Sequence, residues 1–474
     1  MYPLLPVLEL TVEYKPVRRG SRRVLEVSRA FGLGWLGRGF TVFKGFRLEW
    51  VDPAVIYVTG ESGGGKTTLL KAFKRLYGSE AISMDEVEVD EDEVLCEAIG
   101  RDTKEALYYL SMAGLAEAYL FIRSYGELSA GQRYRYRLAK MFYRAVREGR
   151  KAVIVDEFCS LLDRTTARVV AYLTQKLSRR LGLTLVAASS HTDIAEDLNP
   201  DILVVKPFLQ PPVVEHRDVT PKPFSLSNLV RIVEGRFRDY FKLERFHYKG
   251  FRPAYPAKVF KAVYGRETIG VIVYSHAPIA CRCRRMVFGS NLWDYVKSGR
   301  LLAISRVVVH PKWRGVGLGV RLVRETLPRC GADVVETMAA MAVYNPFFEK
   351  AGMRLGCSYT VEHDEALRRL DGLLSRYGFD PKLRTSWRMV YDWLRKLDSE
   401  KLEEFKRNLS KLRLPRVNRK TIELRNRLKT GGPVSLHSLA TYLFSYPSPG
   451  MKYNYYYWLN PRVERLLQPR RVAA

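Results

Sequence analysis

The stretch Gly60-Glu61-Ser62-Gly63-Gly64-Gly65-Lys66-Thr67 decides the fold of the first part of this chain. It follows the apolar run Val55-Ile56-Tyr57-Val58 and precedes a helical run that begins at Thr68, so it joins a predicted strand to a predicted helix. Glycines here free backbone N–H groups to wrap around phosphate oxygens, and the helix N-terminus adds more donors. We expect Lys66 to reach the β and γ phosphates of ATP and the Thr67 hydroxyl to ligate Mg²⁺. The predicted phosphate-binding residues are Gly60, Glu61, Ser62, Gly63, Gly64, Gly65, Lys66, Thr67 and Thr68.

Two further motifs follow in order. Leu128-Ser129-Ala130-Gly131-Gln132 precedes a helix, and the apolar run Ala152-Val153-Ile154-Val155 ends in Asp156-Glu157. By itself Leu128–Gln132 is a helix start capped by Ser129. Together with the phosphate loop, the series resembles the ABC ATPases, whose signature is LSxGQ. The chemistry suits the residue types, because Asp156 can hold Mg²⁺ while Glu157 orients and deprotonates the attacking water.

The resemblance to ABC ATPases extends to two later positions. Ser160-Leu161-Leu162-Asp163 is similar to the family's D-loop, and His191, after the strand Ala187–Ser190, is similar to its switch histidine. In this family two nucleotide domains pair head to tail, so a chain with one signature is expected to form a homodimer around ATP. The resemblance implies that Ser129, Gly131, Gln132 and Asp163 contact nucleotide and that Glu157 and His191 are catalytic.

The chain departs from the ABC pattern between the phosphate loop and the signature. The glutamine that the family uses there to sense Mg²⁺ is absent, and an acidic stretch, Asp85 to Glu97, with eight carboxylates occupies the region. The helix after the signature is basic, so we expect some of its cations to pair with this stretch or with the partner subunit. The adenine-stacking aromatic is left open among Phe40, Phe43 and Phe46.

A second glycine-rich turn lies in Ile304-Ser305-Arg306-Val307-Val308-Val309-His310-Pro311-Lys312-Trp313-Arg314-Gly315-Val316-Gly317-Leu318-Gly319. A strand, a glycine turn and a helix start in this order form an anion site suited to pyrophosphate. The stretch resembles the acetyl-CoA motif of GNAT-type acetyltransferases, (Q/R)xxGx(G/A). With Asn345, which opens a helix typical of the family's second half, the implied acetyl-CoA residues are Val307, Val309, Arg314, Gly315, Val316, Gly317, Leu318, Gly319 and Asn345.

The acyl-transfer chemistry is less determined than the coenzyme site. GNAT enzymes often place a proton-donating tyrosine where this chain has Phe348, which cannot donate. Either Tyr344 or His247 donates the proton, or the thiolate leaves to water, and Glu336 or His247 is the candidate base. The pairs His247-Tyr248 and Ser305-Arg306 are similar to those of a subset that includes nucleobase-modifying GNAT proteins. A non-catalytic, ligand-binding module is the alternative. An exocyclic base amine is neutral at pH 7, whereas a lysine acceptor needs a general base.

Length and patterning predict an α/β protein of several domains. The 474 residues exceed what one core organises. We predict an ABC-type P-loop ATPase domain at residues 1–206, a proline-rich linker at 207–224, a GNAT-fold domain at 225–360 and a basic, mainly helical extension at 361–474. This order resembles the archaeal fusions of an ABC-type ATPase with a GNAT-type acetyltransferase domain.

Charge indicates the partner. The chain has 79 Lys and Arg against 50 Asp and Glu, a formal net charge of +29, which favours a nucleic-acid partner. The tail adds Lys452-Tyr453-Asn454-Tyr455-Tyr456-Tyr457-Trp458, either a base-stacking segment or a buried cluster. No apolar run is long enough for a membrane helix and no leader pattern opens the chain, so we expect a cytoplasmic protein without membrane contact. The predicted function is ATP-dependent acetyl transfer to a base amine in tRNA or rRNA, with RNA favoured over DNA. The alternatives are a nucleic-acid-binding ABC ATPase, acting in DNA maintenance or on the ribosome with a non-catalytic GNAT domain, and a protein lysine acetyltransferase.

Overall fold

A computed structural model describes residues 6–14, 21–32, 39–247, 252–361, 365–414, 419–446, 450–467 and 469. The chain divides into two compact units. One comprises Met1–Ser275 with Ile304–Cys330, and the other comprises His276–Ala303 with Gly331–Ala474.

A six-stranded sheet forms the centre of the first unit. Its strand order is β4-β5-β6-β3-β7-β8, and all neighbours are parallel except β7 and β8. The apolar runs that predicted strands lie in this sheet, buried on both faces as a parallel sheet requires. The strands are β3 (Val55–Thr59), β4 (Ala81–Ser83), β5 (Ala152–Val155), β6 (Thr184–Ser189), β7 (Ile202–Val205) and β8 (Val213–His216).

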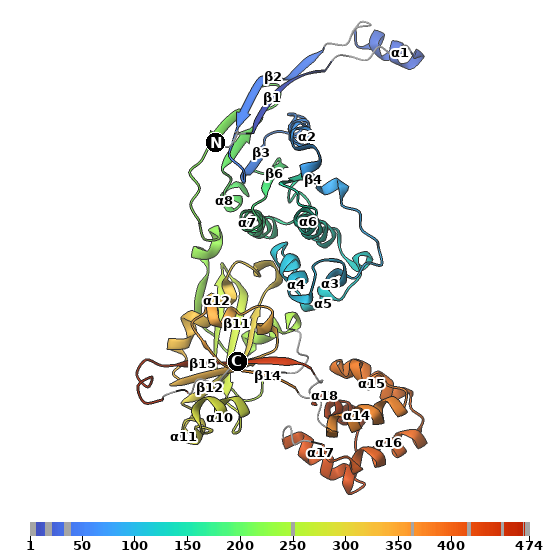
Figure 1. The fold of residues 1–474 in the computed structure, drawn as a ribbon, viewed down its shortest axis with the longest axis vertical. Helices are drawn as coiled ribbons and strands as arrows, with labels where there is room; N and C mark the ends of the chain where they lie inside the picture. The colour runs from blue at the N-terminus through green and yellow to red at the C-terminus, as the bar shows by residue number, and fades with distance from the viewer. Residues whose placement is uncertain are drawn as a thin grey trace. The chain divides into compact units, whose positions relative to one another are not determined.

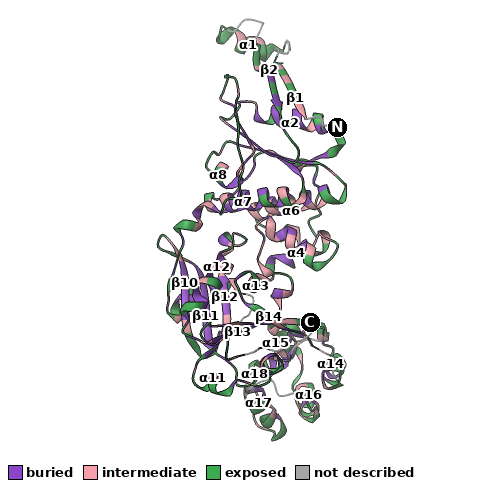
Figure 2. Ribbon diagram, turned by 60° about the vertical axis from the view of Figure 1, so that its left-hand side comes forward, coloured by how far each residue is buried: buried purple, intermediate pink, exposed green. Residues whose placement is uncertain are grey.

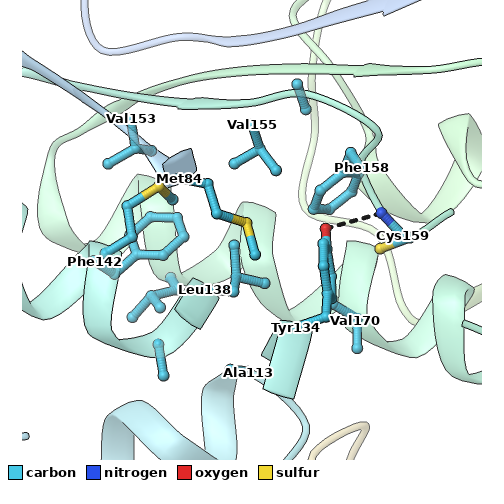
Figure 3. Close-up of a cluster of buried hydrophobic side chains, with 14 of the residues drawn as sticks. Met84, Ala113, Tyr134, Leu138, Phe142, Val153, Val155, Phe158, Cys159 and Val170 are labelled. Atoms are coloured by element: carbon cyan, nitrogen blue, oxygen red, sulfur yellow. Dashed lines mark hydrogen bonds between the residues drawn. The ribbon is translucent and has the colours of Figure 1, made fainter. Parts of the chain in front are cut away.

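Helices cover both faces of this sheet because successive strand residues point to opposite sides. Val55 and Tyr57 pack with residues of α6 (Ala130–Arg147) and α7 (Arg164–Leu181). Ile56 and Val58 pack with residues of α2 (Lys66–Tyr77). Figure 3 shows part of the first cluster, where the backbone N–H of Cys159 donates to the Tyr134 hydroxyl at 2.9 Å. The loop after β5 is thereby fixed to the helix that follows the signature.

Two further structures complete this region. The antiparallel strands β1 (Val7–Tyr14) and β2 (Phe40–Glu49) form a separate ribbon, and α1 (Arg22–Ala30) lies at its end (Figure 1). No residue of α1 is buried, and Figure 2 shows the helix in the colours of exposed and half-exposed residues. The short helices are α3 (Leu95–Ala98), α4 (Thr103–Met112), α5 (Ala118–Phe121) and α8 (Ala195–Leu198).

The acidic stretch pairs with the basic helix α6, which confirms that expectation. Arg133 donates to both carboxylate oxygens of Glu91 at 3.0 Å, and Lys140 lies 2.6 Å from an oxygen of Glu93. The stretch therefore neutralises part of the charge on α6.

The proline-rich segment is more than a linker. Val213–His216 forms β8 and pairs antiparallel with β7, although Pro211 and Pro212 come just before it. Proline cannot donate to a ladder, but the four residues that follow can, and an edge strand needs donors on one side only. The predicted Pro-rich linker at 207–224 therefore contains an edge strand of the first sheet.

A mixed sheet of seven strands follows, in the order β9-β10-β11-β12-β13-β15-β14. β12 and β13 are parallel, and β10 is antiparallel to β9 and β11, as β15 is to β13 and β14. Most of β11 is buried (Figure 2). The strands are β9 (Arg231–Glu234), β10 (Pro256–Tyr264), β11 (Glu267–His276), β12 (Leu301–Val309), β13 (Val334–Ala339), β14 (Arg354–Thr360) and β15 (Lys452–Leu459).

The helices between these strands are short. They are α9 (Phe237–Phe241), α10 (Arg282–Phe288), α11 (Trp293–Lys297), α12 (Leu318–Thr326) and α13 (Phe347–Lys350).

The tyrosine-rich segment is an internal strand of this sheet. β15 lies between β13 and β14, and Tyr455, Tyr456 and Tyr457 are buried. Period-two alternation cannot reveal this, because all three consecutive rings are covered. The buried alternative therefore holds for these rings, and the base-stacking interpretation is wrong for them. The sheet also continues beyond the predicted border at residue 360.

Among the described residues, five α-helices lie between β14 and β15 in the sequence (Figure 1). Their buried side chains form one hydrophobic core cluster. That core includes Leu370, Leu394, Phe405 and Leu443. The helices are α14 (Glu365–Arg376), α15 (Trp387–Lys396), α16 (Ser399–Lys411), α17 (Arg419–Lys429) and α18 (Leu436–Phe444). In the part of the chain that the structure describes, none of the helices has the length and apolarity to cross a bilayer.

Candidate functional site

The predicted phosphate loop joins β3 to α2. Gly63 and Gly65 have φ of 73° and 103°, so only glycine fits there without strain, and Gly65 caps α2 without a side-chain bond. The Lys66 ammonium is nearly buried and donates to the carbonyl oxygens of Gly60 at 2.9 Å and Glu61 at 2.8 Å. Ser62 and Glu61 are exposed, and Thr68 is half-buried on α2. Backbone donors and one ammonium therefore converge on a single loop, as phosphate binding requires.

A hydroxyl and a carboxylate meet beside this loop. Thr67 donates through Oγ1 to Oδ2 of Asp156 at 2.6 Å. Both are hard oxygen donors, and Mg²⁺ is commonly held by one or two such side chains together with phosphates and waters. The two residues fit Mg²⁺, although they lie 89 positions apart in sequence.

Glu157 follows Asp156 and adopts a strained conformation. Its φ is 48°, in the left-handed region that non-glycine residues avoid, and such strain is concentrated at functional sites. The carboxylate is exposed and accepts from the Ser160 hydroxyl at 2.8 Å. Sequence reasoning missed this role for Ser160, because only the turn of the chain after β5 brings the two together.

The signature lies at the start of α6. Ser129 and Gln132 form a capping box, in which the Gln132 amide oxygen accepts from the Ser129 N–H at 3.0 Å. Ser129 is exposed, and Gly131 is half-exposed. The segment is thus both the helix cap that its residues predict and an accessible helix N-terminus.

Asp163 and His191 lie on loops that are tied to each other. Asp163 caps α7, accepting from the Thr166 hydroxyl at 2.7 Å. The next residue, Arg164, forms an ion pair with Asp193, two residues beyond His191. The Tyr57 hydroxyl donates to the His191 carbonyl oxygen. Sequence reasoning missed Tyr57 because it reads as an ordinary strand residue.

Comparison with known proteins adds a match over this region. A protein-family model described as an AAA domain matches residues 51–194. The chain carries an ABC-type P-loop ATPase domain. The methionine import ATP-binding protein MetN of Streptomyces coelicolor is 33% identical over 114 residues, which cover 23% of this chain and 30% of that protein. MetN of Helicobacter hepaticus is 24% identical over 204 residues, covering 35% of this chain and 56% of that protein.

The match to these relatives is partial, spanning 30% to 56% of their length. Among solved structures, the dimeric bacterial ABC transporter cassette MJ0796 is 16% identical, covers 46% of this chain and all of that chain, and has a TM-score of 0.33. The ADP conformation of the ATP-binding cassette MJ1267 is 17% identical, covers 38% of this chain and 86% of that chain, and has a TM-score of 0.29.

The aromatic candidates around the ATPase domain separate by burial. Phe43 and Phe46 are buried and pack on each other, whereas Phe40 is exposed and stacks on exposed Tyr14 at 5.2 Å. Lys206 is a further residue that the sequence did not single out. Its ammonium is buried over the Phe43 ring, its backbone fills the space next to Gly60, and burial lowers its pKa.

The second glycine-rich turn joins β12 to α12, as the sequence predicts. Gly315 and Gly317 have φ of 85° and 87°, Gly317 caps α12 without a side-chain bond, and nothing lies within 4 Å of a Cβ placed there. Free N–H groups and open space suit an anionic ligand. Val307, Val309, Val316 and Gly319 are half-buried, and Leu318 is buried.

Arg314 does not face this turn as a free cation. Its guanidinium donates to three carbonyl oxygens, those of Val309 at 3.0 Å, Ala116 at 2.7 Å and Phe246 at 2.9 Å. Arginine has five N–H donors, and these bonds use all three of its nitrogen atoms. The residue therefore connects the preceding strand to the segments that carry Ala116 and Phe246 by hydrogen bonds.

Glu336 is buried in an ion pair. Arg284, itself fully buried, donates to both of its oxygens, and the Tyr455 hydroxyl adds a bond at 2.9 Å. Neither oxygen is without a donor, so this geometry supplies no accessible base. The arginine comes from α10 and the tyrosine from β15, and no spacing in the sequence indicates either contact.

The remaining acyl-transfer candidates are accessible. Tyr344 and Asn345 are exposed, and His247 is half-buried after the carbonyl that Arg314 engages. Phe348 is buried and packs on Tyr456. Tyr248 lies outside the described residues.

Proposed function

We propose that this chain is an ATP-hydrolysing homodimer that transfers acetyl groups from acetyl-CoA to a base amine of RNA. The domain borders at residues 206, 224 and 360 are part of this proposal. Two strands depart from them, because β8 lies within the linker and β15 joins the second sheet from beyond residue 360. The observation that carries the ATPase half is the convergence of Thr67, Asp156 and Glu157 beside the phosphate loop.

The hydrolytic step follows from these residues. Thr67 and Asp156 would hold Mg²⁺, which when bound neutralises charge on the phosphates. Lys66 and the loop N–H groups bind the phosphate oxygens, Glu157 takes the proton of the attacking water, and His191 orients the γ-phosphate. Ser160 orients the Glu157 carboxylate.

The dimer rests on the accessible signature. Ser129 caps the 18-residue helix α6 and Gly131 lies in its first turn, and the positive end of the helix dipole suits a γ-phosphate. A second copy would bring its nucleotide to this helix start. The exposed ring of Phe40, with Tyr14, is the candidate surface for adenine.

Phosphate release and light scattering test this half. The full chain with ATP and Mg²⁺ is expected to release phosphate, and the non-hydrolysing variant Glu157→Gln is expected to double in mass when ATP is added. No phosphate release by the wild-type chain would overturn the ATPase proposal.

The acetyl-transfer half rests on the second glycine-rich turn. The residues present fit a pyrophosphate at the start of α12, because a Cβ at Gly317 would meet nothing within 4 Å and Gly317 caps the helix without a side-chain bond. The parallel pairing of β12 with β13 and the mixed sheet around them are compatible with a GNAT fold. Acetyl-CoA supplies the thioester.

In transfer, the base nitrogen attacks the thioester carbonyl carbon, the C–S bond breaks, and the amine proton must leave. His247 is the group we assign to that proton, since Glu336 is engaged by Arg284. Tyr344 is exposed and has the hydroxyl needed to protonate the thiolate.

Nucleic acid is the acceptor that the net charge of +29 favours. The protein would be incubated with total RNA, ATP and acetyl-CoA, and the RNA digested to nucleosides for mass spectrometry. We expect the mass gain of one acetyl group on one nucleoside. No gain on any nucleoside, together with acetyl incorporation into protein, would instead assign a lysine acceptor.

One specific observation favours a second function. The side chain of Arg314 is taken by three carbonyls and Phe348 is buried, which suits a second module that binds ligand without transfer. The chain would then be a nucleic-acid-binding ABC ATPase. Calorimetry with acetyl-CoA decides, because heat of binding without acetyl transfer identifies this case.

A further inference from the structure

We infer that Lys312, which precedes the second glycine-rich turn, is a positioning residue of the ATPase site. It holds Asp163 at the start of α7 and so holds the loop that carries Glu157. This inference rests on the proposed ATP hydrolysis, and it makes the rate of that hydrolysis depend on a residue outside residues 1–206.

The contact is direct. The Lys312 ammonium lies 3.2 Å from Oδ1 of Asp163, and each side chain is 48% exposed. Asp163 also accepts hydrogen bonds from the N–H and the hydroxyl of Thr166 at the start of α7, so a second interaction fixes the position of the carboxylate. Burial tends to raise the pKa of Asp163, but the bonds from Thr166 and Lys312 outweigh it and lower the pKa overall.

The backbone of Lys312 is fixed next to α7. Trp313 is buried and packs on Phe224 and Tyr264, and Phe224 packs on Tyr172 of α7. On the other side, Arg314 is bonded to the carbonyl of Ala116. An exposed ion pair usually contributes little because two long side chains must be ordered. Here the contacts of Trp313 and Arg314 hold the backbone next to Lys312, which reduces the conformational entropy that the ion pair must overcome.

Gly315 brings the turn close to α7 as well. A Cβ at Gly315 would lie 2.9 Å from Cδ1 of Leu173, so a larger residue would push the turn from the helix. Packing and charge therefore act together on α7.

The loop between Asp163 and Glu157 is short and bonded within itself. The Leu162 N–H donates to the carbonyl of Cys159, and Ser160 bonds Glu157 through both its N–H and its hydroxyl. A shift of Asp163 is therefore transmitted to Glu157. Since Glu157 already has a strained φ of 48°, its position depends on support from the rest of the loop.

The test compares Lys312→Met, Lys312→Arg and a control, Lys297→Met, which removes an exposed lysine of α11. An exposed pair is worth up to about 1 kcal/mol, which corresponds to a fall in kcat of roughly 2- to 5-fold for Lys312→Met. KM for ATP should change less than kcat, because the substitution leaves the phosphate loop at Gly60–Thr67 unaltered. Lys312→Arg should restore kcat, and Lys297→Met should leave it unchanged.

Salt separates a charge effect from a packing effect. Raising ionic strength from 0.05 to 0.5 M should lower the wild-type kcat toward that of Lys312→Met. The ratio of the wild-type kcat to the Lys312→Met kcat should then be close to one. An unchanged kcat in Lys312→Met, or a fall that Lys312→Arg does not rescue, would overturn the inference.

Hydrogen exchange keeps the two proposals distinguishable. Without nucleotide, residues 157–163 should exchange faster in Lys312→Met than in the wild type. Faster exchange in a chain that hydrolyses no ATP would refute the proposed function and leave the positioning contact standing. Equal exchange would refute the positioning role whether or not ATP is hydrolysed.

Discussion

The two glycine-rich turns of this chain look alike in sequence but differ in where their cations point. Each follows a strand, precedes a helix and uses glycines at positive φ. Lys66 bonds two carbonyls of its own loop. Arg314 bonds one carbonyl of the strand that precedes it, that of Val309, and two from distant segments, those of Ala116 and Phe246. The first cation belongs to a binding loop, and the second belongs to the scaffold.

The carboxylates near the two turns differ in the same way. Glu157 is exposed and strained, while Glu336 is buried and bonded by Arg284 and Tyr455. A motif thus predicts a backbone conformation well, but it does not say which side chains stay free for chemistry.

The largest expected effect is on the exposed carboxylate. Glu157→Gln should lower the rate of phosphate release by about 10²- to 10⁴-fold, because general-base assistance is lost. Nucleotide binding should persist, as measured by calorimetry. The control Glu88→Gln, at an exposed position, should hydrolyse ATP normally. A variant that stays monomeric with ATP would contradict the head-to-tail dimer.

The buried carboxylate should behave as a structural group. Arg284→Met leaves Glu336 without its partner, and breaking a buried pair costs about 3–5 kcal/mol of unfolding free energy. Chemical denaturation measures this loss. The neighbouring Arg285→Met, at an exposed position, should change stability little. If Arg284→Met kept its stability and lost only acetyl transfer, Glu336 would have to be reconsidered as the base.

The two cations allow the most direct contrast. Lys66→Ala should weaken ATP binding by roughly 10- to 100-fold, since bonds to charged groups contribute about 1.5–3 kcal/mol. Arg314→Ala should instead lower the unfolding free energy by about 2–4 kcal/mol, because three carbonyls lose their donor. Calorimetry measures ligand affinity and chemical denaturation measures unfolding free energy, and both are applied to Lys66→Ala and to Arg314→Ala. Loss of acetyl-CoA binding in Arg314→Ala at unchanged stability would show that Arg314 turns to the ligand.

The smallest expected effect lies within the second turn. Gly317→Ala should cost about 1 kcal/mol of stability, from left-handed backbone strain alone. Gly315→Ala should cost more, because its Cβ also meets Leu173. Thermal unfolding of the two variants measures the difference. Equal costs would indicate that the turn moves freely away from α7.

Much of the ATPase domain could be predicted because its signals are local. Val55–Thr59 and Ala152–Val155 are continuous apolar runs, and the residues after them carry the motifs. Parallel strands place these ends at one edge of the sheet, which brings Thr67 to Asp156. The Ser160 contact with Glu157 could not be predicted, because it depends on a positive φ that the sequence does not require.

The second module was predictable only in part. The β12 strand and the start of α12 follow from the residues at 301–319. The place of β15 between β13 and β14 does not, since a helical segment of about 90 residues intervenes and the pairing is long-range. The prolines before β8 likewise concealed an edge strand.

By itself, then, the sequence determined the two glycine-rich turns, the order of the nucleotide motifs and the excess of positive charge. These are properties of adjacent residues, which local backbone preference and charge dictate. Only the tertiary structure decided that Arg314 connects distant segments, that Glu336 is paired, that the tyrosines of β15 are buried, and that Lys312 meets Asp163. Such outcomes depend on which residues, distant in sequence, the fold places in contact. A buried polar group needs a hydrogen-bond partner, and only the tertiary structure determines which partner lies within reach.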